Sequence, residues 1–362
     1  MPVHEVDTIV LGGGQAGLAT GYYLTKRGLR PESDFVIVDR GPQPGGAWQH
    51  VWRSVRLISP PAYTRLPGLK WERLSEAPPS GPEVAAYFAR YEKHFGLPVR
   101  RPVVVRRVTD ADPGGKHERT GPLLVETDTG TWRARAVVNA TGTWDRPFLP
   151  SVNGAATFGG RQLHAAGYDS PEEFAGLRVI VVGGGHSALQ ILAEIATVAT
   201  TVWVTRRPPE FRDKGLTEAD LVAVTDAVAA RVAQGKPLRS VVSYTGLTMT
   251  PAVERAAQRG VLTARPMFER ITPEGVAWAD GSTERADVLV WATGFRPALG
   301  HLAPLRLRSE LGGIAMKGPR TAVDPRVHLV GYGPSASMIS AHRAAAVAAR
   351  EVAAGRQDAR AH

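Results

Sequence analysis

The stretch DTIVLGGGQAGLATGYYLTKRG (residues 7–28) decides the fold class. An apolar strand from Thr8 to Leu11 leads into Gly12-x-Gly14-x-x-Gly17, and an amphipathic helix follows. In this pattern the first glycine allows a tight turn and the second lets the backbone approach a pyrophosphate, while the third lets the helix pack on the strand. The N–H groups at the start of the helix suit phosphate oxygens. The stretch therefore predicts a Rossmann-like α/β unit that binds a dinucleotide.

An acidic residue follows at the expected distance. A second strand, Phe35 to Val38, ends in Asp39. An acid at this place accepts a hydrogen bond from a ribose hydroxyl. A lone glycine triplet is a weak signal, but strand, helix and acid in register make it strong.

The same pattern recurs in LRVIVVGGGHSALQILAEIA (residues 177–196), with Gly183, Gly185 and Ala188 in the glycine positions. The next strand, 201–205, ends in Arg206-Arg207, where an acid is expected. Two guanidiniums suit the 2′-phosphate of NADPH, so the second unit is predicted to prefer NADPH, with NADH as the alternative donor. The competing interpretation is a solvated surface pair.

Two dinucleotide units in one chain of 362 residues indicate electron transfer between two cofactors. We expect FAD in the first unit and NADPH in the second. The chain has no cysteine, which excludes the dithiol chemistry of a disulfide reductase. Two Ala-Thr-Gly stretches, 140–142 and 292–294, end predicted strands and mark crossings between the units. They predict a discontinuous FAD-binding domain, 1–165 plus 290–362, with an NADPH-binding domain, 166–289, inserted in it.

The bulk properties restrict the remaining classes. The net charge is +10, but the arginine pairs are scattered and lack interleaved aromatics, so we expect anionic small ligands and no nucleic acid. The N-terminal MPVHEVDTIV has no Lys or Arg before its apolar run, and no charge-free apolar run reaches the ~18 residues of a membrane span. A cytoplasmic enzyme without membrane association is expected. The ten histidines form no pairs of metal-ligand spacing, so no metal is predicted.

Several ordered motifs resemble those of flavin-containing monooxygenases of the compact bacterial type. The fingerprint F-x-G-x-x-x-H-x-x-x-[F/Y] is matched within FGGRQLHAAGYD (residues 158–169) by Phe158, Gly160, His164 and Tyr168. Further matches are GGAW (45–48), ATGTWDRP (140–147) and WATGFRP (291–297). The chain is most similar to the small bacterial members, including those encoded in arsenic-resistance operons.

The resemblance implies that NADPH reduces FAD and that O2 then forms a C4a-peroxyflavin, which transfers one oxygen atom to a small soft nucleophile. Sulfoxidation of a sulfide is the expected reaction, because Tyr168 stands where Baeyer–Villiger relatives usually have Trp. Oxidation of trivalent arsenic or of ketones is the alternative within the family. An uncoupled NADPH oxidase or diaphorase, or a redox sensor acting through a partner, is the alternative outside it. A homodimer is also expected.

The site residues follow from the glycine loops and the resemblance. Trp48 is expected to approach the flavin, and Ile58 stands where animal members carry an asparagine that contacts it, which predicts more leakage to hydrogen peroxide. Both are the predicted catalytic positions. The full set of predicted cofactor-binding residues is Gly12, Gly14, Gln15, Ala16, Gly17, Asp39, Arg40, Gly46, Trp48, Val105, Ala140, Thr141, Gly142, Trp144, Gly183, Gly185, His186, Ser187, Ala188, Arg206, Arg207, Ala292, Thr293 and Gly294.

Three segments have structural interpretations. The stretch 158–169 is predicted to be an interdomain connector in which His164 and Tyr168 brace the junction. An apolar-periodic helix over 218–235 is expected to cover the substrate entrance, to join a dimer interface or to pack as a surface helix. An Ala-rich helix over 344–354 is predicted to precede a frayed tail, GRQDARAH.

Overall fold

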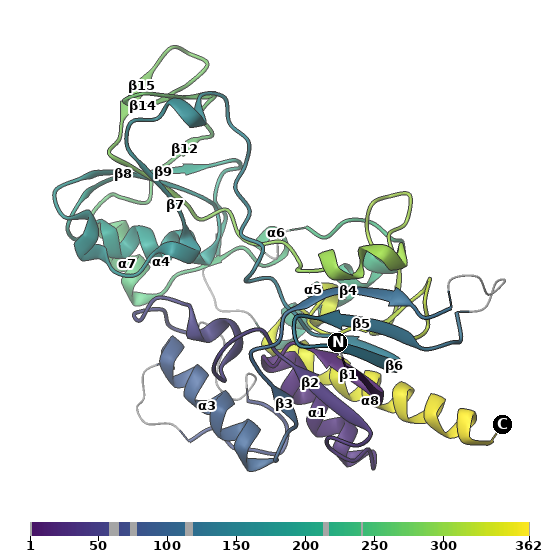
Figure 1. Ribbon diagram of the computed structural model, residues 1–362. Coiled ribbons are helices and arrows are strands. Elements are labelled where there is room, and N and C mark those ends of the chain that lie inside the picture. Colours follow the sequence, from purple (N-terminus) through teal and green to yellow (C-terminus); the bar gives the residue numbers. More distant parts are fainter. Residues whose placement is uncertain are drawn as a thin grey trace.

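The computed structural model describes residues 2–57, 65–72, 78–112, 119–212, 217–239 and 242–361. Two lobes are visible in Figure 1, one built around a mixed sheet with a parallel centre and the other around a parallel sheet. We call the lobe with the larger sheet the first lobe and the other the second lobe. Both chain termini lie on the first lobe. This is the α/β architecture that the two glycine loops predict.

The sheet of the first lobe has nine strands, in the order β17-β18-β19-β6-β1-β2-β3, with β5 pairing with β6 and β4 with β5. They are β1 (Val3–Leu11), β2 (Phe35–Val38), β3 (Val99–Arg100), β4 (Val105–Asp110), β5 (Leu123–Thr127), β6 (Thr131–Asn139), β17 (Met316–Lys317), β18 (Arg320–Thr321) and β19 (Val327–Leu329). The run β19-β6-β1-β2-β3 is parallel. Parallel strands covered on both faces need continuous apolar sequences, which explains why all of β2 is buried.

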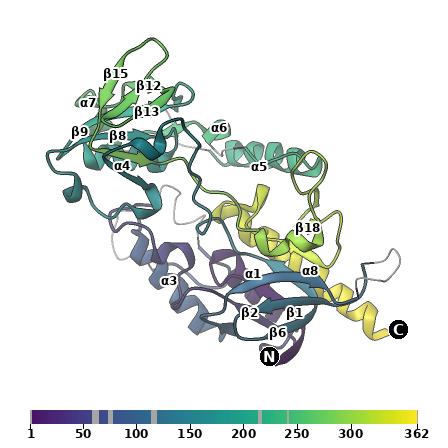
Figure 2. The same ribbon diagram turned by 45° about the horizontal axis from the view of Figure 1, so that its top comes forward.

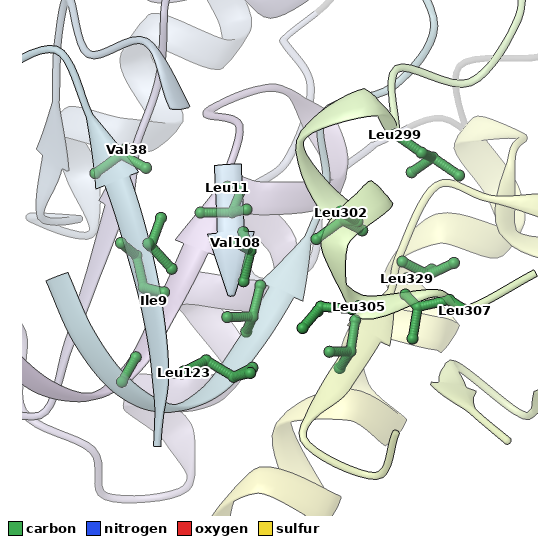
Figure 3. Packing of buried hydrophobic residues seen from close by; sticks show 14 of the residues in the cluster. Ile9, Leu11, Val38, Val108, Leu123, Leu299, Leu302, Leu305, Leu307 and Leu329 are labelled. Atoms are coloured by element: carbon green, nitrogen blue, oxygen red, sulfur yellow. The ribbon is translucent and has the colours of Figure 1, made fainter. Parts of the chain in front are cut away.

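Helical segments pack on both faces of this sheet. The helical segments are α1 (Gln15–Lys26), α3 (Gly81–His94), α8 (Met338–Ala361), η1 (Gly46–Gln49), η5 (Gly300–Leu305) and η6 (Gly333–Ser335). On one face, α1, α3 and α8 share a core with Val10, Phe35 and Ile37. On the other face, Ile9 and Leu11 pack with Val108 and with leucines of η5, as Figure 3 shows. Successive residues of a strand point to opposite faces, so β1 serves both cores.

The C-terminal helix is longer than its sequence predicts. The predicted helix over 344–354 extends over Met338–Ala361, so the expectation of a frayed tail is wrong. Arg356 lies within that tail, and its guanidinium pairs with Asp34 at 2.6 Å and with Asp7 at 2.7 Å. These ion pairs fasten the last turns of α8 to the sheet, a contact that a local propensity argument does not contain.

The sheet of the second lobe has five parallel strands in the order β12-β9-β8-β16-β7. They are β7 (Arg161–His164), β8 (Arg178–Val182), β9 (Thr200–Thr205), β12 (Ala264–Pro266) and β16 (Val288–Trp291). Because β7 and β16 both belong to this sheet, the boundaries expected at 165 and 290 cut through it. The Ala-Thr-Gly stretch at 292–294 directly follows β16.

Smaller elements complete the second lobe. They are α4 (His186–Ile195), α6 (Val242–Thr245), α7 (Pro251–Gln258), β10 (Phe211–Arg212), β11 (Leu247–Thr248), β13 (Arg270–Thr272), β14 (Gly275–Ala277), β15 (Thr283–Arg285), η2 (Ala155–Thr157), η3 (Ala165–Gly167) and η4 (Pro171–Phe174). Figure 1 shows α4 and α7 side by side on one face of the five-stranded sheet. The strands β13, β14 and β15 form a separate antiparallel sheet.

Helix α5 (Glu218–Ala233) leaves the second lobe and packs on the first. Its first turn has a capping box between Thr217 and Asp220. Val232, which is 1% exposed, joins the core of the first lobe, and Val228 packs against that core. Figure 2 shows α5 away from the five-stranded sheet. Residues 217–239 therefore connect the lobes, although sequence assigns them to the inserted domain.

Candidate functional site

The two glycine loops share one construction. A Cβ on Gly12 would lie 2.5 Å from the carbonyl oxygen of Ala140, and a Cβ on Gly183 would lie 2.2 Å from that of Ala292. Each alanine begins one of the two Ala-Thr-Gly stretches, and its N–H donates to the strand before the loop. The first glycine of each loop is therefore needed because an Ala-Thr-Gly backbone passes directly beside it.

The third position of the loops differs. A Cβ on Gly17 would lie 1.8 Å from the carbonyl oxygen of Gly12, so helix α1 approaches its strand too closely for any side chain. Ala188 holds the corresponding place in α4 and is 0% exposed. Its methyl group is part of the core of the second lobe. The second loop thus leaves room for one carbon that the first excludes.

A cavity of about 470 Å³ opens beside the first glycine loop. Thirteen predicted residues line it, from segments spread over the first half of the chain: Gly12, Gly14, Gln15, Ala16, Asp39, Arg40, Gly46, Trp48, Val105, Ala140, Thr141, Gly142 and Trp144. Gly17 is buried behind it. The structure therefore brings the predicted residues of the first unit together at one site, while their role in binding FAD stays a prediction.

The cavity fits a dinucleotide phosphate at the N-terminus of α1. Gly14 is the N-cap of α1, no side chain caps this terminus, and its first turn holds no acidic residue. A Cβ on Gly14 would find only the Cα of Gly46, at 3.7 Å, so the glycine is not required by packing within the protein. Free N–H groups and the positive end of the helix dipole together attract a phosphate.

Asp39 has a bracing role within the first unit. Its two carboxylate oxygens accept hydrogen bonds from the N–H groups of Gly13, at 2.6 Å, and Gly41, at 2.8 Å. These bonds hold the glycine loop against the end of β2. A carboxylate has about four acceptor positions, so the predicted ribose contact is compatible with both bonds.

An aromatic wall borders the same cavity, and two of its three rings were not predicted. His50 stacks on Trp144 with centroids 6.0 Å apart, and Trp144 stacks on Phe295 at 5.0 Å. All three line the cavity. His50 lies two residues after GGAW, and Trp144 and Phe295 follow the two Ala-Thr-Gly stretches. Phe295 follows the second of these stretches directly, which is the signal that could have identified it.

His301 is a further lining residue that sequence reasoning missed. Its Nε2–H donates to Oδ1 of Asn139 at 2.6 Å, next to the first Ala-Thr-Gly stretch. Burial lowers the pKa of His301 to about 4, so its imidazole is neutral at pH 7. An ion pair lies nearby at the cavity, between Arg40 and Asp145 at 2.9 Å. Burial raises the pKa of Asp145, although Arg40 opposes this shift.

The predicted residues of the second unit do not line this cavity. Helix α4 begins at Gly185 with no side-chain cap and no acid in its first turn, so it also offers free N–H groups. Ser187 is exposed at this terminus, whereas the side chain of His186 bonds to another element of the second lobe. Its Nε2 accepts the N–H of Thr248 at 3.2 Å, and burial lowers its pKa. The neutral ring therefore ties α4 to β11, a role that its place in the motif does not indicate.

Arg206 and Arg207 extend from the end of β9 into solvent. Within the described part of the chain, no carboxylate lies within ion-pair distance of either guanidinium. Both are therefore available to an anionic ligand. The second Ala-Thr-Gly stretch contacts the segment that follows the first one, because Thr293 Oγ1 donates to the carbonyl of Phe148. Gly294 accepts from Nε2 of His164 at 3.0 Å.

The stretch 158–169 lies at the junction, as its sequence position predicts. His164 is the last residue of β7, and its Nδ1 accepts the N–H of Ala166 at 3.0 Å. Tyr168 is 3% exposed, and its hydroxyl donates to Glu194 of α4 at 2.7 Å. Neither ring belongs to the cavity lining. This arrangement supports the bracing role proposed for both residues.

Ile58, the second predicted catalytic position, lies outside the described residues. Where the chain is described, no group of three His, Asp or Glu side chains is placed to hold a metal ion. Nor does any described helix have the length and apolar character needed to cross a bilayer.

Known proteins share this arrangement. Residues 9–315 match the family model of the pyridine nucleotide-disulphide oxidoreductases. A solved flavin-containing monooxygenase from Stenotrophomonas maltophilia is 39% identical, with 97% of this chain and 99% of that chain covered and a TM-score of 0.82. The chain belongs to the flavin-containing monooxygenase family. Within the broader oxidoreductase family, this monooxygenase has no cysteine for a dithiol step.

Two curated relatives of this flavin-containing monooxygenase match over part of their length. An oxidoreductase named CzcO from Bacillus velezensis is 30% identical over 57% of this chain and 56% of its own length. The chain therefore spans little more than half of that relative. A Baeyer–Villiger monooxygenase from Streptomyces coelicolor is 31% identical over 58% of this chain and 39% of its own length.

Proposed function

We propose that the protein is an NADPH-preferring FAD monooxygenase that transfers one oxygen atom from O2 to a small soft nucleophile, with a sulfide as the first candidate. The observation that carries this proposal is the presence of two glycine-loop helices without side-chain caps, one at a cavity and one next to the strand that ends in two exposed arginines. The first half of the chain and its C-terminal part would hold FAD, and the inserted lobe would hold NADPH.

Each part of the first site has a role in this proposal. FAD, when bound, supplies the redox and oxygen chemistry. The α1 N-terminus would hold its phosphates, and Asp39 would orient the loop and contact a ribose. Trp48 and the stacked rings of His50, Trp144 and Phe295 would border the reacting centre and exclude water from it. No general acid or base is assigned, because transfer of oxygen to a soft nucleophile requires none from the protein.

The donor preference would come from Arg206 and Arg207. The two exposed guanidiniums can form charge-assisted hydrogen bonds to a 2′-phosphate, which NADH lacks. One such bond contributes about 1.5–3 kcal/mol, so Arg206→Ala should raise KM for NADPH roughly 10- to 100-fold. KM for NADH should change little. Arg285→Ala, another exposed arginine of the second lobe, is the matched control and should leave both values unchanged.

The reaction itself is tested by product analysis. The FAD-loaded protein is supplied with NADPH, O2 and a thioether such as thioanisole, and sulfoxide, hydrogen peroxide and NADPH consumption are measured together. We expect sulfoxide that carries one atom of labelled O2. If all NADPH is recovered as peroxide with thioethers, amines, ketones and arsenite alike, the protein is an oxidase and the monooxygenase proposal fails.

A Baeyer–Villiger reaction is the second candidate, favoured by the similarity to the Streptomyces coelicolor enzyme. Lactone formation from a cyclic ketone without sulfoxide formation would favour it over sulfoxidation. Two further expectations remain proposals: a cytoplasmic location, and a homodimer, which light scattering of the purified protein would test.

A further inference from the structure

A strap runs from the cavity beside the first glycine loop to the second lobe. We use the word for residues 46–57, which begin with η1 and continue past Trp52. Its first part lines the cavity through Gly46, Ala47, Trp48, Gln49 and His50. Its second part reaches the second lobe, because Trp52 is 5% exposed and lies in the hydrophobic core of that lobe. Two residues beyond His50, the chain is thus part of another sheet's core. The strap returns to the first lobe at Leu57, whose N–H donates to the carbonyl of Pro79 at 2.9 Å just before α3.

One carboxylate holds the strap where it enters the second lobe. Oε1 of Glu194 accepts hydrogen bonds from Ser54 Oγ at 2.8 Å and Trp52 Nε1 at 3.4 Å. Its other oxygen, Oε2, accepts the hydroxyl of Tyr168 at 2.7 Å. The rings of Trp52 and Tyr168 also meet edge to face at 5.6 Å. Glu194 therefore joins the strap and the connector at a single point.

Glu194 lies on the helix that begins at the second glycine loop. Helix α4 runs from His186 to Ile195, and its N-terminus is the predicted site for the NADPH pyrophosphate. A helix of this length is a rigid element of about 15 Å. A movement of α4 on dinucleotide binding would displace Glu194, and with it the strap and the wall of the cavity.

We infer that Glu194 is a positioning residue that couples the second glycine loop to the wall of the FAD cavity through the strap. It contacts neither dinucleotide itself and acts through Trp52 and Ser54 on Trp48 and His50. This inference rests on the proposed function only in that both dinucleotides bind, because no turnover is required to observe it. Coupling of this kind is reciprocal: a ligand at the second loop changes the affinity for FAD by the factor with which FAD changes the affinity for that ligand.

The test measures the dissociation constant of FAD for the apoprotein, by quenching of flavin fluorescence, with and without saturating NADP⁺. In the unchanged protein we expect the two constants to differ about fivefold or more. In Glu194→Ala the ratio should fall to less than about twofold, although each ligand still binds. Ser54→Ala, which removes one bond at an exposed side chain, should reduce the ratio by less than Glu194→Ala does.

A purely structural role gives a different result. Thr197→Ala is the matched control, because its hydroxyl contacts only the backbone carbonyl of Glu194 and not the carboxylate. It should leave the ratio unchanged. If Glu194→Ala does not fold, Glu194→Met, which keeps the length of the side chain but has no oxygen to accept the bonds of Ser54 and Trp52, and Ser54→Ala carry the test. A ratio in these variants equal to that of the unchanged protein overturns the inference, as does a ratio of one in the unchanged protein. Absence of sulfoxide with the ratio intact contradicts only the proposed function.

Discussion

At the scale of single residues, two positions of the first loop carry glycine for different reasons. Gly17 is required by the protein itself, because its Cβ would lie 1.8 Å from a backbone oxygen. A Cβ added to Gly14 would lie 3.7 Å from the nearest atom, which is ordinary contact, and Gly14 lines the cavity. One glycine therefore serves folding, whereas the other is left open for a ligand.

Two substitutions separate these causes. Gly17→Ala should destabilise the apoprotein by about 1–3 kcal/mol, since helix α1 must move away from its strand. Gly14→Ala should cost the apoprotein less than about 1 kcal/mol, the usual difference between glycine and alanine at an N-cap, while FAD binding weakens about tenfold or more. Denaturant unfolding of the apoprotein and flavin titration measure the two effects. Equal destabilisation of the apoprotein by both variants would contradict this assignment.

Three histidines with lowered pKa values predict that the folded protein loses stability in acid at pH values above those at which carboxylates titrate. Burial lowers the pKa of His301 to about 4 and also lowers those of His164 and His186. The unfolded chain takes up protons near pH 6.5, but the folded chain does not, so this stability is complete above pH 6.5. It is lost as the pH falls toward 4, at up to about 1.4 kcal/mol per pH unit for each histidine.

Unfolding free energies at pH 7.5, 6.5 and 5.5 test this slope. Carboxylates with lowered pKa values, such as Asp34 and Asp110, stay charged in both states over this range and add little. His301→Gln should flatten the slope, whereas His94→Gln, at an exposed position, should leave it unchanged. A slope that is the same in all three proteins would show that His301 is not responsible.

At the scale of elements, Arg356 contributes two ion pairs to the attachment of the last turns of α8. Arg356 is 11% exposed at its side chain and pairs with Asp34, which is 4% exposed. Arg356→Met removes the charge and keeps most of the aliphatic contact, so it should destabilise the protein by about 1–3 kcal/mol. The loss is limited because Asp34 keeps its pair with Arg30. Denaturant unfolding measures it.

The control for this prediction lies on the same helix. Arg343 is exposed in α8, and no ion pair is found for it within the described chain. Arg343→Met should change the unfolding free energy by less than about 0.5 kcal/mol. If the two variants are equally stable, the ion pairs of Arg356 do not hold the end of the helix.

At the scale of the whole molecule, the net charge of +10 should assist the binding of anionic dinucleotides. Raising the ionic strength from about 0.05 to 0.5 M shortens the screening length severalfold and should raise KM for NADPH severalfold. KM for NADH should rise less, because it lacks the 2′-phosphate that the exposed arginines would meet. KM for a neutral thioether is the internal reference. Equal salt dependence for the two donors would contradict a phosphate contact.

Much of the fold could be predicted because its signals are local. The strands β2 and β16 are continuous apolar runs, and both have the bounds that the sequence indicates. Thirteen of the predicted cofactor-binding residues line one cavity, and those of the glycine loop, Asp39 and the first Ala-Thr-Gly stretch directly follow the ends of parallel strands. Errors arose where a segment packs on a distant part of the chain, as α5 and the end of α8 do.

The sequence by itself therefore determined the two dinucleotide-binding units, their order and the family. Each depends on a few consecutive residues whose backbone must turn tightly or whose side chains must all be buried. Only the tertiary structure decided what surrounds the cavity: the stacked rings of His50, Trp144 and Phe295, and the attachment of the strap to Glu194. These contacts join residues about 90 to 150 positions apart in the chain. Such pairs meet only in the folded chain, so no local pattern records them.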